Sequence, residues 1–526
     1  MEYIIKYTGV LPALGFPTDL LDAQFAIMDL GEQDPMGLLD YRQITCFEPA
    51  RSLSGLEART VQASPIDYQS MEAACIPQVH REYGLTGKGV LIGFVDSGLD
   101  PDHPEFLGED GNSRVTALWD MAAQGAPPEG FRQGALYTGE QISAGQVPRG
   151  DLKGHGTAVA AIAAGRSGTA PGASIAMVKL ASARTTDVMR AIKFLLDQAE
   201  ALGMPCVINL SYGTNWGSHW GQTLFESYID QSAQRGRSAI VCAAGNEGSG
   251  AHHFFGRMEE DGALDVEFTI STLRQQVYLS LWKNFADEMV FDLTLPNGQS
   301  TGPLTEGGRR LRFGPVRVSV FYGVPTHYSA SQEAIFLMEA PAGEMDGLWK
   351  LRCTGKKVAD GRFDMWLPTV EEVTDRTAFL QPEPDLTITL PATALYPISV
   401  GGYRTETETA SPFSGRGGQD CWGRVMLDIM APAEGVRSAK AGGGYDVFTG
   451  TSMAAPFVSG AAALMMEWGI VRGNDPFLYG QRVKAFLCKG ALRSPFLSYP
   501  NPQWGYGRLN LCGTMNELVG HIERGL

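Results

Sequence analysis

Between residues 87 and 250 the hydrophobic pattern alternates between two kinds of segment. Continuous apolar runs, typical of strands buried on both faces of a parallel sheet, are separated by longer stretches with helical character. This alternation predicts βαβ units and an α/β fold with a doubly wound, mostly parallel sheet, whose functional residues lie beyond the carboxyl ends of the strands. The predicted strands are GVLIGFVDSG (89–98), ASIAMVKL (173–180), PCVINLSYG (205–213) and SAIVCAAGN (238–246), and the predicted helices are TAVAAIAAG (157–165), TTDVMRAIKFLLDQAEALG (185–203) and TLFESYIDQSAQRG (223–236).

Residues 251–385 follow a different pattern. Short segments such as QVYLSLWKN (276–284) and GLWKLRCTG (347–355) are separated by polar or Gly/Pro turns, with no helical stretch between them. This spacing predicts an antiparallel β jelly roll or sandwich. The α/β pattern returns with YPISVGGY (396–403) and VMLDIMAP (425–432). The β segment is therefore predicted to be a domain inserted into the α/β domain, without a catalytic role of its own.

The N-terminal residues form a separate small unit. EYIIKYTG (2–9) and AQFAIMDL (23–30) alternate like strands, YRQITCFEPARSL (41–53) holds a third strand, and EQDPMGLLDY (32–41) a short helix. Together they predict a small α+β module, followed by a polar linker at 57–75. The predicted organisation is an N-terminal module at 1–64, an α/β domain in two parts at 65–250 and 386–526, and the inserted β domain at 251–385.

Composition and charge narrow the class of protein. Hydrophobic residues make up 44% and charged residues 19% of the 526 residues, as in ordinary globular proteins. The net charge of −16 disfavours nucleic acid or an anionic membrane as partner. The sequence shows neither a signal peptide nor a transmembrane segment, which predicts a cytoplasmic location. The eight cysteines are scattered without a C-x-x-C pair, so we expect reduced, mostly buried thiols rather than a disulfide framework or a zinc site.

The segment GTSMAAPFVSG (450–460) places a hydroxyl, that of Ser452, on the first turn of a predicted helix of small buried residues. A serine at such a position is commonly an N-cap that accepts hydrogen bonds from backbone amides. It is equally suited to be a nucleophile, because the helix dipole and the free amides favour developing negative charge. The second interpretation requires a base, an acid that orients the base, and an oxyanion donor elsewhere in the chain.

Three further residues can provide these groups. Asp96 ends the strand GFVDSG, and His155 lies in GHGTAVAAIAAG at the start of a helix. Each alone is also typical of a cap or turn, but with Ser452 they form a nucleophile, its base and the carboxylate that orients the base. Asn246 follows a buried strand and can be a turn residue, or can donate its amide to an oxyanion beside the backbone N–H of Ser452. A lipase or esterase is excluded, because it needs G-x-S-x-G with the acid and histidine after the serine.

The motifs VDSG, GHGTAVAAIAAG, AAGNEG and GTSMAAPFVSGAAAL resemble, in this order, the Asp, His, oxyanion-Asn and Ser motifs of the subtilisin-like serine proteases (subtilases, peptidase family S8). The resemblance covers about residues 80–250 and 390–515. It implies a serine endopeptidase with the catalytic residues Asp96, His155 and Ser452 and the oxyanion residue Asn246. Ala158 stands where the family usually has His, beside the triad rather than in it. The substrate-binding residues that the resemblance implies are Ser211, Tyr212 and Gly213, which pair with the substrate backbone, and Ala243, Ala244 and Gly245, which form a pocket wall.

Neither a cofactor nor a metal ligand is predicted. The serine chemistry requires no cofactor. Subtilases often bind structural calcium, but the sequence has no Asp-rich loop of EF-hand type, and an irregular calcium site leaves no sequence signature. Tyr212 and the nearby Trp216 are candidates for narrowing the cleft, or are buried core aromatics. The predicted partners are protein or peptide substrates and the N-terminal module itself.

ITCFEPARSL (44–53), GKGVLIGFVDSGLDPDHPEF (87–106) and DGNSRVTALWD (110–120) resemble more narrowly the clostridial Csp spore-germination proteases. Those proteins have a short prodomain and a jelly roll between the Asn and Ser motifs, and the resemblance makes spore association an alternative location. The resemblance to subtilases in general implies that residues 1–64 are a prodomain that helps folding and is cut by the enzyme itself. Because proline is poorly tolerated just after a scissile bond, we expect the cut not between Ser64 and Pro65 but within the 57–70 linker, near Gln62 or Ala63. The Csp resemblance implies that the cut prodomain stays bound as an inhibitor. Two alternatives stay open: residues 1–60 are never cut, or the chain is a catalytically silent regulator or binding protein.

Overall fold

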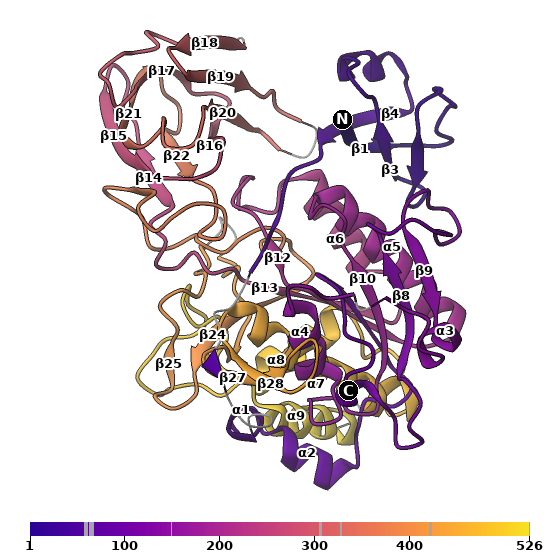
Figure 1. Cartoon of the computed structure of the whole chain (residues 1–526). Helices are drawn as coiled ribbons and strands as arrows, with labels where there is room; N and C mark the ends of the chain where they lie inside the picture. The colour runs from indigo at the N-terminus through magenta and orange to yellow at the C-terminus, as the bar shows by residue number, and fades with distance from the viewer. Residues whose placement is uncertain are drawn as a thin grey trace.

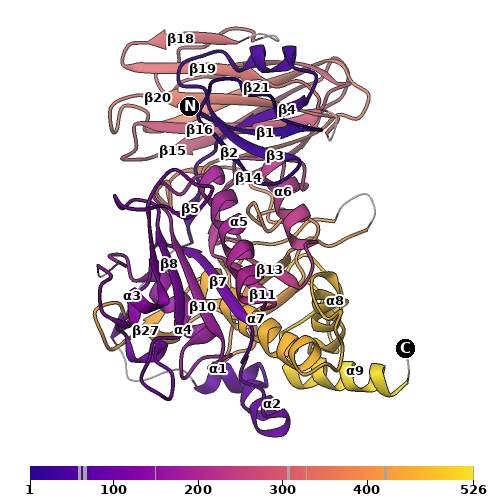
Figure 2. The same ribbon diagram turned by 90° about the vertical axis from the view of Figure 1, so that its right-hand side faces the viewer.

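In the computed structural model the described residues are 1–56, 61–62, 68–148, 150–304, 308–326, 329–419 and 423–524. They form three parts. An N-terminal module and the inserted β domain lie next to each other at one end of the α/β domain (Figures 1 and 2).

The predicted doubly wound sheet is confirmed. Its strand order is β25-β24-β13-β11-β7-β10-β8-β9, and β26 pairs with β24. The pairs β13–β11, β11–β7 and β7–β10 are parallel, whereas β9 and β25 join the edges as antiparallel strands. The strands are β7 (Leu91–Asp96), β8 (Val115–Asp120), β9 (Ala135–Thr138), β10 (Ser174–Lys179), β11 (Cys206–Leu210), β13 (Ser238–Ala243), β24 (Ile398–Arg404), β25 (Thr409–Ala410) and β26 (Ile429–Pro432).

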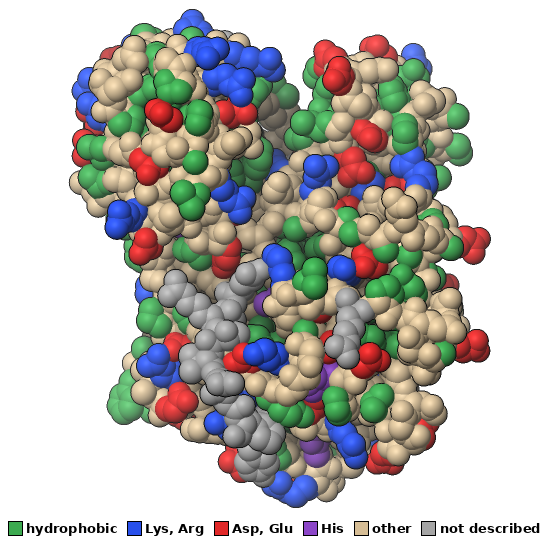
Figure 3. Space-filling view, viewed as in Figure 1, with side chains coloured by type: hydrophobic (Ala, Val, Ile, Leu, Met, Phe, Trp, Pro, Cys, Tyr) green, Lys and Arg blue, Asp and Glu red, His purple; other side chains and the backbone are tan. Residues whose placement is uncertain are grey.

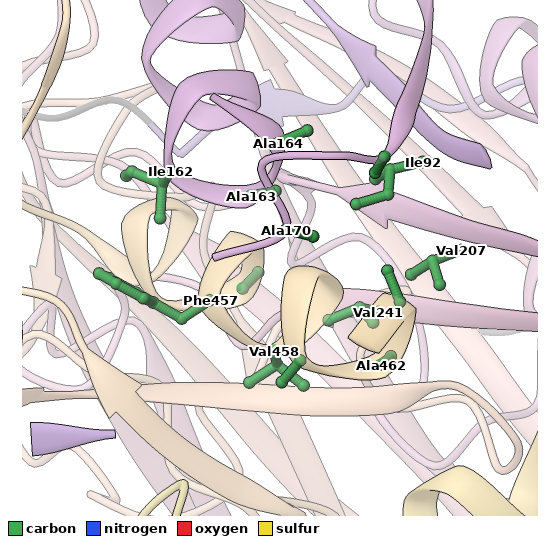
Figure 4. Packing of buried hydrophobic residues seen from close by; sticks show 14 of the residues in the cluster. Ile92, Ile162, Ala163, Ala164, Ala170, Val207, Val241, Phe457, Val458 and Ala462 are labelled. Atoms are coloured by element: carbon green, nitrogen blue, oxygen red, sulfur yellow. The ribbon is translucent and has the colours of Figure 1, made fainter. Parts of the chain in front are cut away.

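Helices cover both faces of this sheet. On one face α4 (His155–Ala164) and α7 (Thr451–Met466) pack on side chains such as Ile92, and on the other α5 (Thr185–Leu202) and α6 (Leu224–Ala233) pack on side chains such as Leu91. Figure 4 shows Ile162 and Ala163 of α4 and Phe457, Val458 and Ala462 of α7 beside Ile92, Val207 and Val241 of the sheet. The remaining helices of the described residues are α1 (Tyr68–Ala73), α2 (Ile76–Tyr83), α3 (Gly139–Ser143), α8 (Gln481–Gly490) and α9 (Leu511–Glu523), with the short 3₁₀ helix η2 (Pro104–Phe106) and the π-helix η3 (Glu467–Val471).

Helix α7 is buried along its whole length because its small residues allow close approach. A Cβ atom on Gly460 would lie 2.4 Å from the Cβ of Thr169, so a larger residue has no room there. Among the described residues, the segment Thr451–Val471 alone is long and apolar enough to cross a membrane, and 89% of its apolar window is buried inside the protein. Packing in the core of the protein accounts for this apolar character.

The N-terminal module is an antiparallel sheet of order β2-β3-β1-β4 that packs on α5 and α6. The predicted strands and the short helix are present, the helix as a 3₁₀ turn, and β2 was missed because it spans three residues. From β4 the chain runs on to β5 (Ser54–Gly55), which leaves the module and pairs with the α/β domain. The module consists of β1 (Glu2–Tyr7), β2 (Thr18–Leu20), β3 (Phe25–Asp29), η1 (Pro35–Asp40) and β4 (Ile44–Pro49).

The inserted domain is made of two antiparallel sheets, of orders β14-β22-β16-β20-β19-β18 and β17-β21-β15-β23, around an apolar core of its own. This confirms the antiparallel β architecture predicted from the strand spacing. Its strands are β14 (His253–Arg257), β15 (Ala263–Ile270), β16 (Gln276–Asn284), β17 (Glu288–Thr294), β18 (Arg309–Phe313), β19 (Val316–Tyr322), β20 (Ser331–Glu339), β21 (Gly347–Lys357), β22 (Arg362–Trp366) and β23 (Ala378–Phe379). A separate small sheet joins β27 (Val436–Ala439), β28 (Tyr445–Phe448) and β6 (Val61–Gln62).

The expectation of reduced thiols alone is wrong for one pair. Cys75, between α1 and α2, is disulfide-bonded to Cys512 in α9. Because the two cysteines are 437 residues apart, their spacing in the sequence does not indicate a disulfide. The packing of α2 against α9 brings the two sulfur atoms together. The other cysteines of the described residues are free and buried, namely Cys46, Cys206, Cys242, Cys353 and Cys488.

Candidate active site

Asp96 and His155 meet at the carboxyl edge of the sheet. Asp96 is the last residue of β7 and His155 the first of α4, and Nδ1 of the imidazole lies 2.7 Å from Oδ1 of the carboxylate. The backbone N–H of Ser97 also donates to Oδ1, at 2.7 Å. Because an ionised carboxylate only accepts hydrogen bonds, this pairing holds the imidazole hydrogen on Nδ1 and leaves Nε2 as the basic nitrogen.

Asp151, which the sequence analysis missed, holds the start of α4 in place. The N-cap position of this helix is Gly154, which has no side chain to cap it. Asp151 instead accepts from the backbone amides of Gly154 at 2.8 Å and Thr157 at 2.9 Å, and from the hydroxyl of Ser97 at 2.8 Å. A carboxylate at a helix N-terminus is favourable electrostatically. The signal in the sequence was an acidic residue three positions before a glycine that begins a helix.

Ser452 is the second residue of α7, and its hydroxyl donates to another part of the chain rather than capping the helix. The acceptor is the backbone carbonyl oxygen of Leu56, 2.6 Å from Oγ. Gly450, the N-cap residue, has a φ of 149°, and a Cβ atom there would lie 3.2 Å from Oγ of Ser452 and 3.4 Å from the oxygen of Leu56. The absent side chain of Gly450 therefore leaves the space in which the hydroxyl and the carbonyl meet.

The Asn246 side chain is fixed in one orientation. Its Oδ1 accepts from the backbone N–H of Thr451 at 3.0 Å and from the Thr451 hydroxyl at 3.2 Å. The amide nitrogen Nδ2 therefore points the other way, where it donates to Oε1 of Glu371 at 2.9 Å. A Cβ atom on Gly450 would lie 3.6 Å from this Nδ2, so the amide borders the same space as the Ser452 hydroxyl. The second hydrogen of Nδ2 is available to a developing oxyanion.

The predicted peptide-binding edge is paired with the chain's own residues 54–56. β12 (Tyr212–Gly213) pairs antiparallel with β5, so that Tyr212 faces Gly55 and Gly213 faces Ser54. The N–H of Leu56 donates to the carbonyl of Ser211 at 3.2 Å. A strand thus approaches Ser452 along the edge where the sequence analysis expected a substrate.

The aromatic residues near this edge have different surroundings. A Cβ atom on Gly55 would lie 3.3 Å from Cζ of Tyr212, so the ring of Tyr212 closes the space beside Gly55. The Trp216 ring instead stacks on Tyr278 of the inserted domain, with the centroids 4.9 Å apart. Of the two aromatic candidates, Tyr212 is a buried residue beside β5, and Trp216 packs on the inserted domain.

The predicted pocket wall lies directly before Asn246, at the end of β13. Ala243 and Ala244 are buried, and the backbone hydrogen bonds of Ala244 run to Val400 and Thr389. A Cβ atom on Gly245 would lie 2.5 Å from the Thr389 side chain, which fills the space that this glycine leaves.

Histidine side chains reach the surface in the middle of the face shown in Figure 3. The described residues contain no group of three or more His, Cys, Asp or Glu side chains arranged to hold a metal ion.

Comparisons with known proteins identify the family. The Subtilase family model matches residues 87–268 and 375–507. A solved structure, that of the Clostridium perfringens CspB protease, is 37% identical with a TM-score of 0.80, over 86% of this chain and 98% of that one.

Curated relatives match shorter segments. Subtilisin-like protease SBT2.2 of Arabidopsis thaliana is 30% identical over 205 residues, which is 32% of this chain and 23% of the relative. Subtilisin E of Bacillus subtilis (strain 168) is 42% identical over 76 residues, 14% of this chain and 18% of the relative. The chain thus spans less than a quarter of the length of these two curated relatives. The family model, in contrast, covers more than half of this chain and includes Asp96, His155, Asn246 and Ser452. This protein belongs to the subtilase family of serine peptidases.

Proposed function

We propose that this protein is a serine endopeptidase that uses Asp96, His155 and Ser452 with Asn246 as an oxyanion donor, and that its first substrate is its own chain. The observation that carries the proposal is the 2.6 Å hydrogen bond between the Ser452 hydroxyl and the carbonyl oxygen of Leu56. The residues before Leu56 are held as a β-strand against β12. The carbonyl group of Leu56 thus meets the hydroxyl that would attack a substrate carbonyl.

The geometry supports attack on this carbonyl. With the oxygen 2.6 Å from Oγ, the carbonyl carbon lies within about 3.8 Å of Oγ, near the distance of a reactive encounter. For the reaction, the Ser452 hydroxyl turns its hydrogen from the Leu56 oxygen to Nε2 of His155. His155 takes this proton as Oγ bonds to the carbon, and the oxyanion accepts from Asn246 and from the backbone N–H of Ser452. The bond to the nitrogen of Glu57 then breaks as His155 returns the proton to that nitrogen. Water releases the acyl group of Leu56 in a second, equivalent cycle.

The bound segment also indicates a substrate class. The Leu56 side chain is fully buried, which favours an apolar residue immediately before the scissile bond. Gly55 fits against the Tyr212 ring, where any Cβ atom would be 3.3 Å away, so a glycine is favoured at the preceding position. Further contacts are mostly backbone hydrogen bonds, a mode of recognition that tolerates varied side chains. We infer a preference for sequences like Leu-Ser-Gly-Leu before the cut.

The proposed cleavage site differs from the expectation of a cut near Gln62 or Ala63. Gln62 belongs to β6, which pairs with β28, and Ala63 lies outside the described residues. The contacts of Leu56 favour the bond between Leu56 and Glu57 instead. The prodomain would then be residues 1–56, shorter than the 1–64 expected from the sequence.

The prodomain has anchors that do not depend on the scissile bond. Oε2 of Glu48 accepts from the first amide of α6, that of Leu224, at 2.9 Å. Arg190 of α5 donates to Oε1 of Glu2 at 2.5 Å and to Asp19 at 2.8 Å. These contacts support a prodomain that stays bound after the cut and blocks the cleft as an inhibitor. A Csp-like role in spore germination rests on the sequence resemblance alone and stays a hypothesis.

Intact-mass measurement of wild type and Ser452→Ala, expressed side by side, tests the proposal. We expect wild type as two polypeptides, residues 1–56 and 57–526, and the variant as one. A wild-type chain that remains whole while hydrolysing peptides would rule out self-processing. Cleavage of both wild type and Ser452→Ala would identify another protease as its cause. A cut at Gln62 or Ala63 would show that the cleavage site is not the bond after Leu56.

The alternative of a catalytically silent regulator makes a different prediction. A fluorophosphonate probe reacts with an activated serine, so folded wild type freed of its prodomain should be labelled and Ser452→Ala should not. Absence of labelling in folded, prodomain-free wild type would favour the regulator.

A further inference from the structure

The turn that follows β22 brings the inserted β domain into the active site. The hydroxyl of Thr369 lies 2.8 Å from that of Ser54 in the bound strand β5. Two residues further along, Oε1 of Glu371 accepts from Nδ2 of Asn246 at 2.9 Å. The inserted domain, which the sequence analysis expected to be non-catalytic, therefore contacts both the bound strand and the oxyanion donor.

These contacts hold the Asn246 carboxamide at both ends. Thr451 binds the oxygen with its N–H and hydroxyl, and Glu371 binds one of the two amide hydrogens. With the plane of the amide fixed in this way, the direction of the second hydrogen is fixed as well. A Cβ atom on Gly450 would lie 3.6 Å from Nδ2 and 3.4 Å from the Leu56 oxygen, so the amide and the carbonyl under attack border the same space.

We propose that Glu371 is a positioning residue for the peptidase reaction, which holds the Asn246 carboxamide so that its second hydrogen faces the oxyanion. The inference rests on the proposed function, because it assigns a role within the same active site. Such a role fits the general requirement that oxyanion donors be preorganised, since they then need no reorientation as charge develops.

The protonation state of Glu371 adds a consequence for pH dependence. Burial, followed by repulsion from Glu247, raises the pKa of Glu371 to about 7. The neutral carboxyl still accepts from Asn246 through Oε1, but the ionised form adds negative charge next to the developing oxyanion and opposes it. Hydrolysis is therefore expected to lose rate as pH rises through this pKa. The titratable and charged groups packed around this site are Glu247, His252, Glu372 and Arg274.

The experiment compares full-length Glu371→Ala and Glu371→Gln with a matched control, Glu372→Ala. Glu372 is the next residue, and its carboxylate accepts from the N–H of Thr369 within the turn. For a peptide with Leu-Ser-Gly-Leu before the cut, Glu371→Ala should lower kcat by about 10-fold or more with KM unchanged, up to the 10²–10³-fold loss typical of a missing oxyanion donor. Glu371→Gln keeps the acceptor and should restore kcat, and it should remove the loss of rate near pH 7. The control should keep kcat.

A double variant tests whether Glu371 acts through Asn246. Asn246→Ala with Glu371→Ala should be no slower than Asn246→Ala alone. A kcat for Glu371→Ala equal to that of Glu372→Ala would overturn the proposal. So would a double variant in which Glu371→Ala lowers kcat as much in the Asn246→Ala background as it does in wild type. If Glu371→Ala does not fold, an unchanged pH profile in Glu371→Gln would overturn it. A wild type that neither hydrolyses the peptide nor reacts with fluorophosphonate would instead refute the proposed function, and this inference with it.

Discussion

Three residues meet at Leu56: Ser452 donates to its carbonyl oxygen, the carbonyl oxygen of Ser211 accepts from its backbone N–H, and Gly450 leaves space beside its carbonyl group. In the proposed reaction none of them would act alone, because a nucleophile without its base, or a carbonyl out of register, gives no reaction. Substitutions at this scale are therefore expected to change the turnover number rather than the fold.

His155→Ala and Ser452→Ala are each expected to reduce peptide hydrolysis by about 10⁴–10⁶-fold, and the double variant little further, because the residues act as one unit. Measured kcat/KM values for the three variants test this. If the loss in the double variant equalled the product of the single losses, His155 would not be the base for Ser452.

Gly450→Ala is expected to abolish most turnover. The added Cβ would lie 3.2 Å from the Ser452 Oγ and 3.6 Å from Asn246 Nδ2, at a φ of 149° that L side chains rarely adopt. Gly435→Ala is a matched control, because its φ is 67° and nothing lies within 4 Å of an added Cβ. Initial rates of peptide hydrolysis should fall in the first variant only. Equal rates in both would show that the site tolerates a side chain at Gly450.

At the level of elements, helix α5 holds the sheet of the N-terminal module. Arg190 is buried in α5 and bonds to Glu2 and Asp19 from the module and to Asp187 from its own helix. Arg132 pairs with the same Asp19, but its side chain is 46% exposed. Both arginines therefore form an ion pair with Asp19, but Arg190 is buried and Arg132 is exposed.

Arg190→Ala should weaken binding of the cleaved prodomain by about 3–5 kcal/mol, because it leaves buried carboxylates without their partner. Arg132→Ala should cost about 0–1 kcal/mol, as exposed pairs generally do. Inhibition constants of the separated prodomain with each variant measure the difference. Equal effects would show that burial of Arg190 contributes nothing to the interface.

We expect the same contact to make the proposed binding of the cleaved N-terminal module sensitive to acid. Burial of Glu2 opposes ionisation, but its bonds to Arg190 outweigh this and lower the pKa of Glu2 below its ordinary value of 4.5. A lowered pKa stabilises the complex above pH 4.5 and loses that contribution as pH falls through the lowered value. We expect the cut prodomain to stay bound at neutral pH and to be released more readily as the pH falls below 4.5. Gel filtration across pH should show this step in wild type and not in Arg190→Ala.

For the whole molecule, the Cys75–Cys512 bond ties the start of the α/β domain to its last helix. If the prodomain is cut off at Leu56, this bond remains within residues 57–526. A cross-link that closes so long a loop restricts the unfolded chain.

Cys75→Ser is expected to lower the free energy of unfolding by about 2–4 kcal/mol. Denaturant unfolding of wild type with and without reductant should show the same loss, and reductant should not change Cys75→Ser further. A wild type whose unfolding midpoint is insensitive to reductant would contradict a stabilising role.

The α/β sheet and the antiparallel β domain could be predicted from the sequence because both leave a local, periodic mark. The run LIGFV in β7 is apolar up to Asp96, and β21 alternates buried and more exposed positions as a half-buried strand does. The short β2 and the two-residue β5 carry no such mark, and β5 exists because it pairs with β12. Asp96, His155, Asn246 and Ser452 were found because each stands at the end of a predicted element within a distinctive motif.

What the sequence by itself determined is the set of elements and the side chains at their ends, because both depend on residues a few positions apart. The tertiary structure decided which distant segments meet there. Leu56 reaches Ser452 across 396 residues, Glu371 reaches Asn246 across 125, and Cys75 reaches Cys512 across 437. Such contacts result from how the N-terminal module, the inserted domain and the last helix pack on the α/β domain, and packing over these separations leaves no periodicity in the chain.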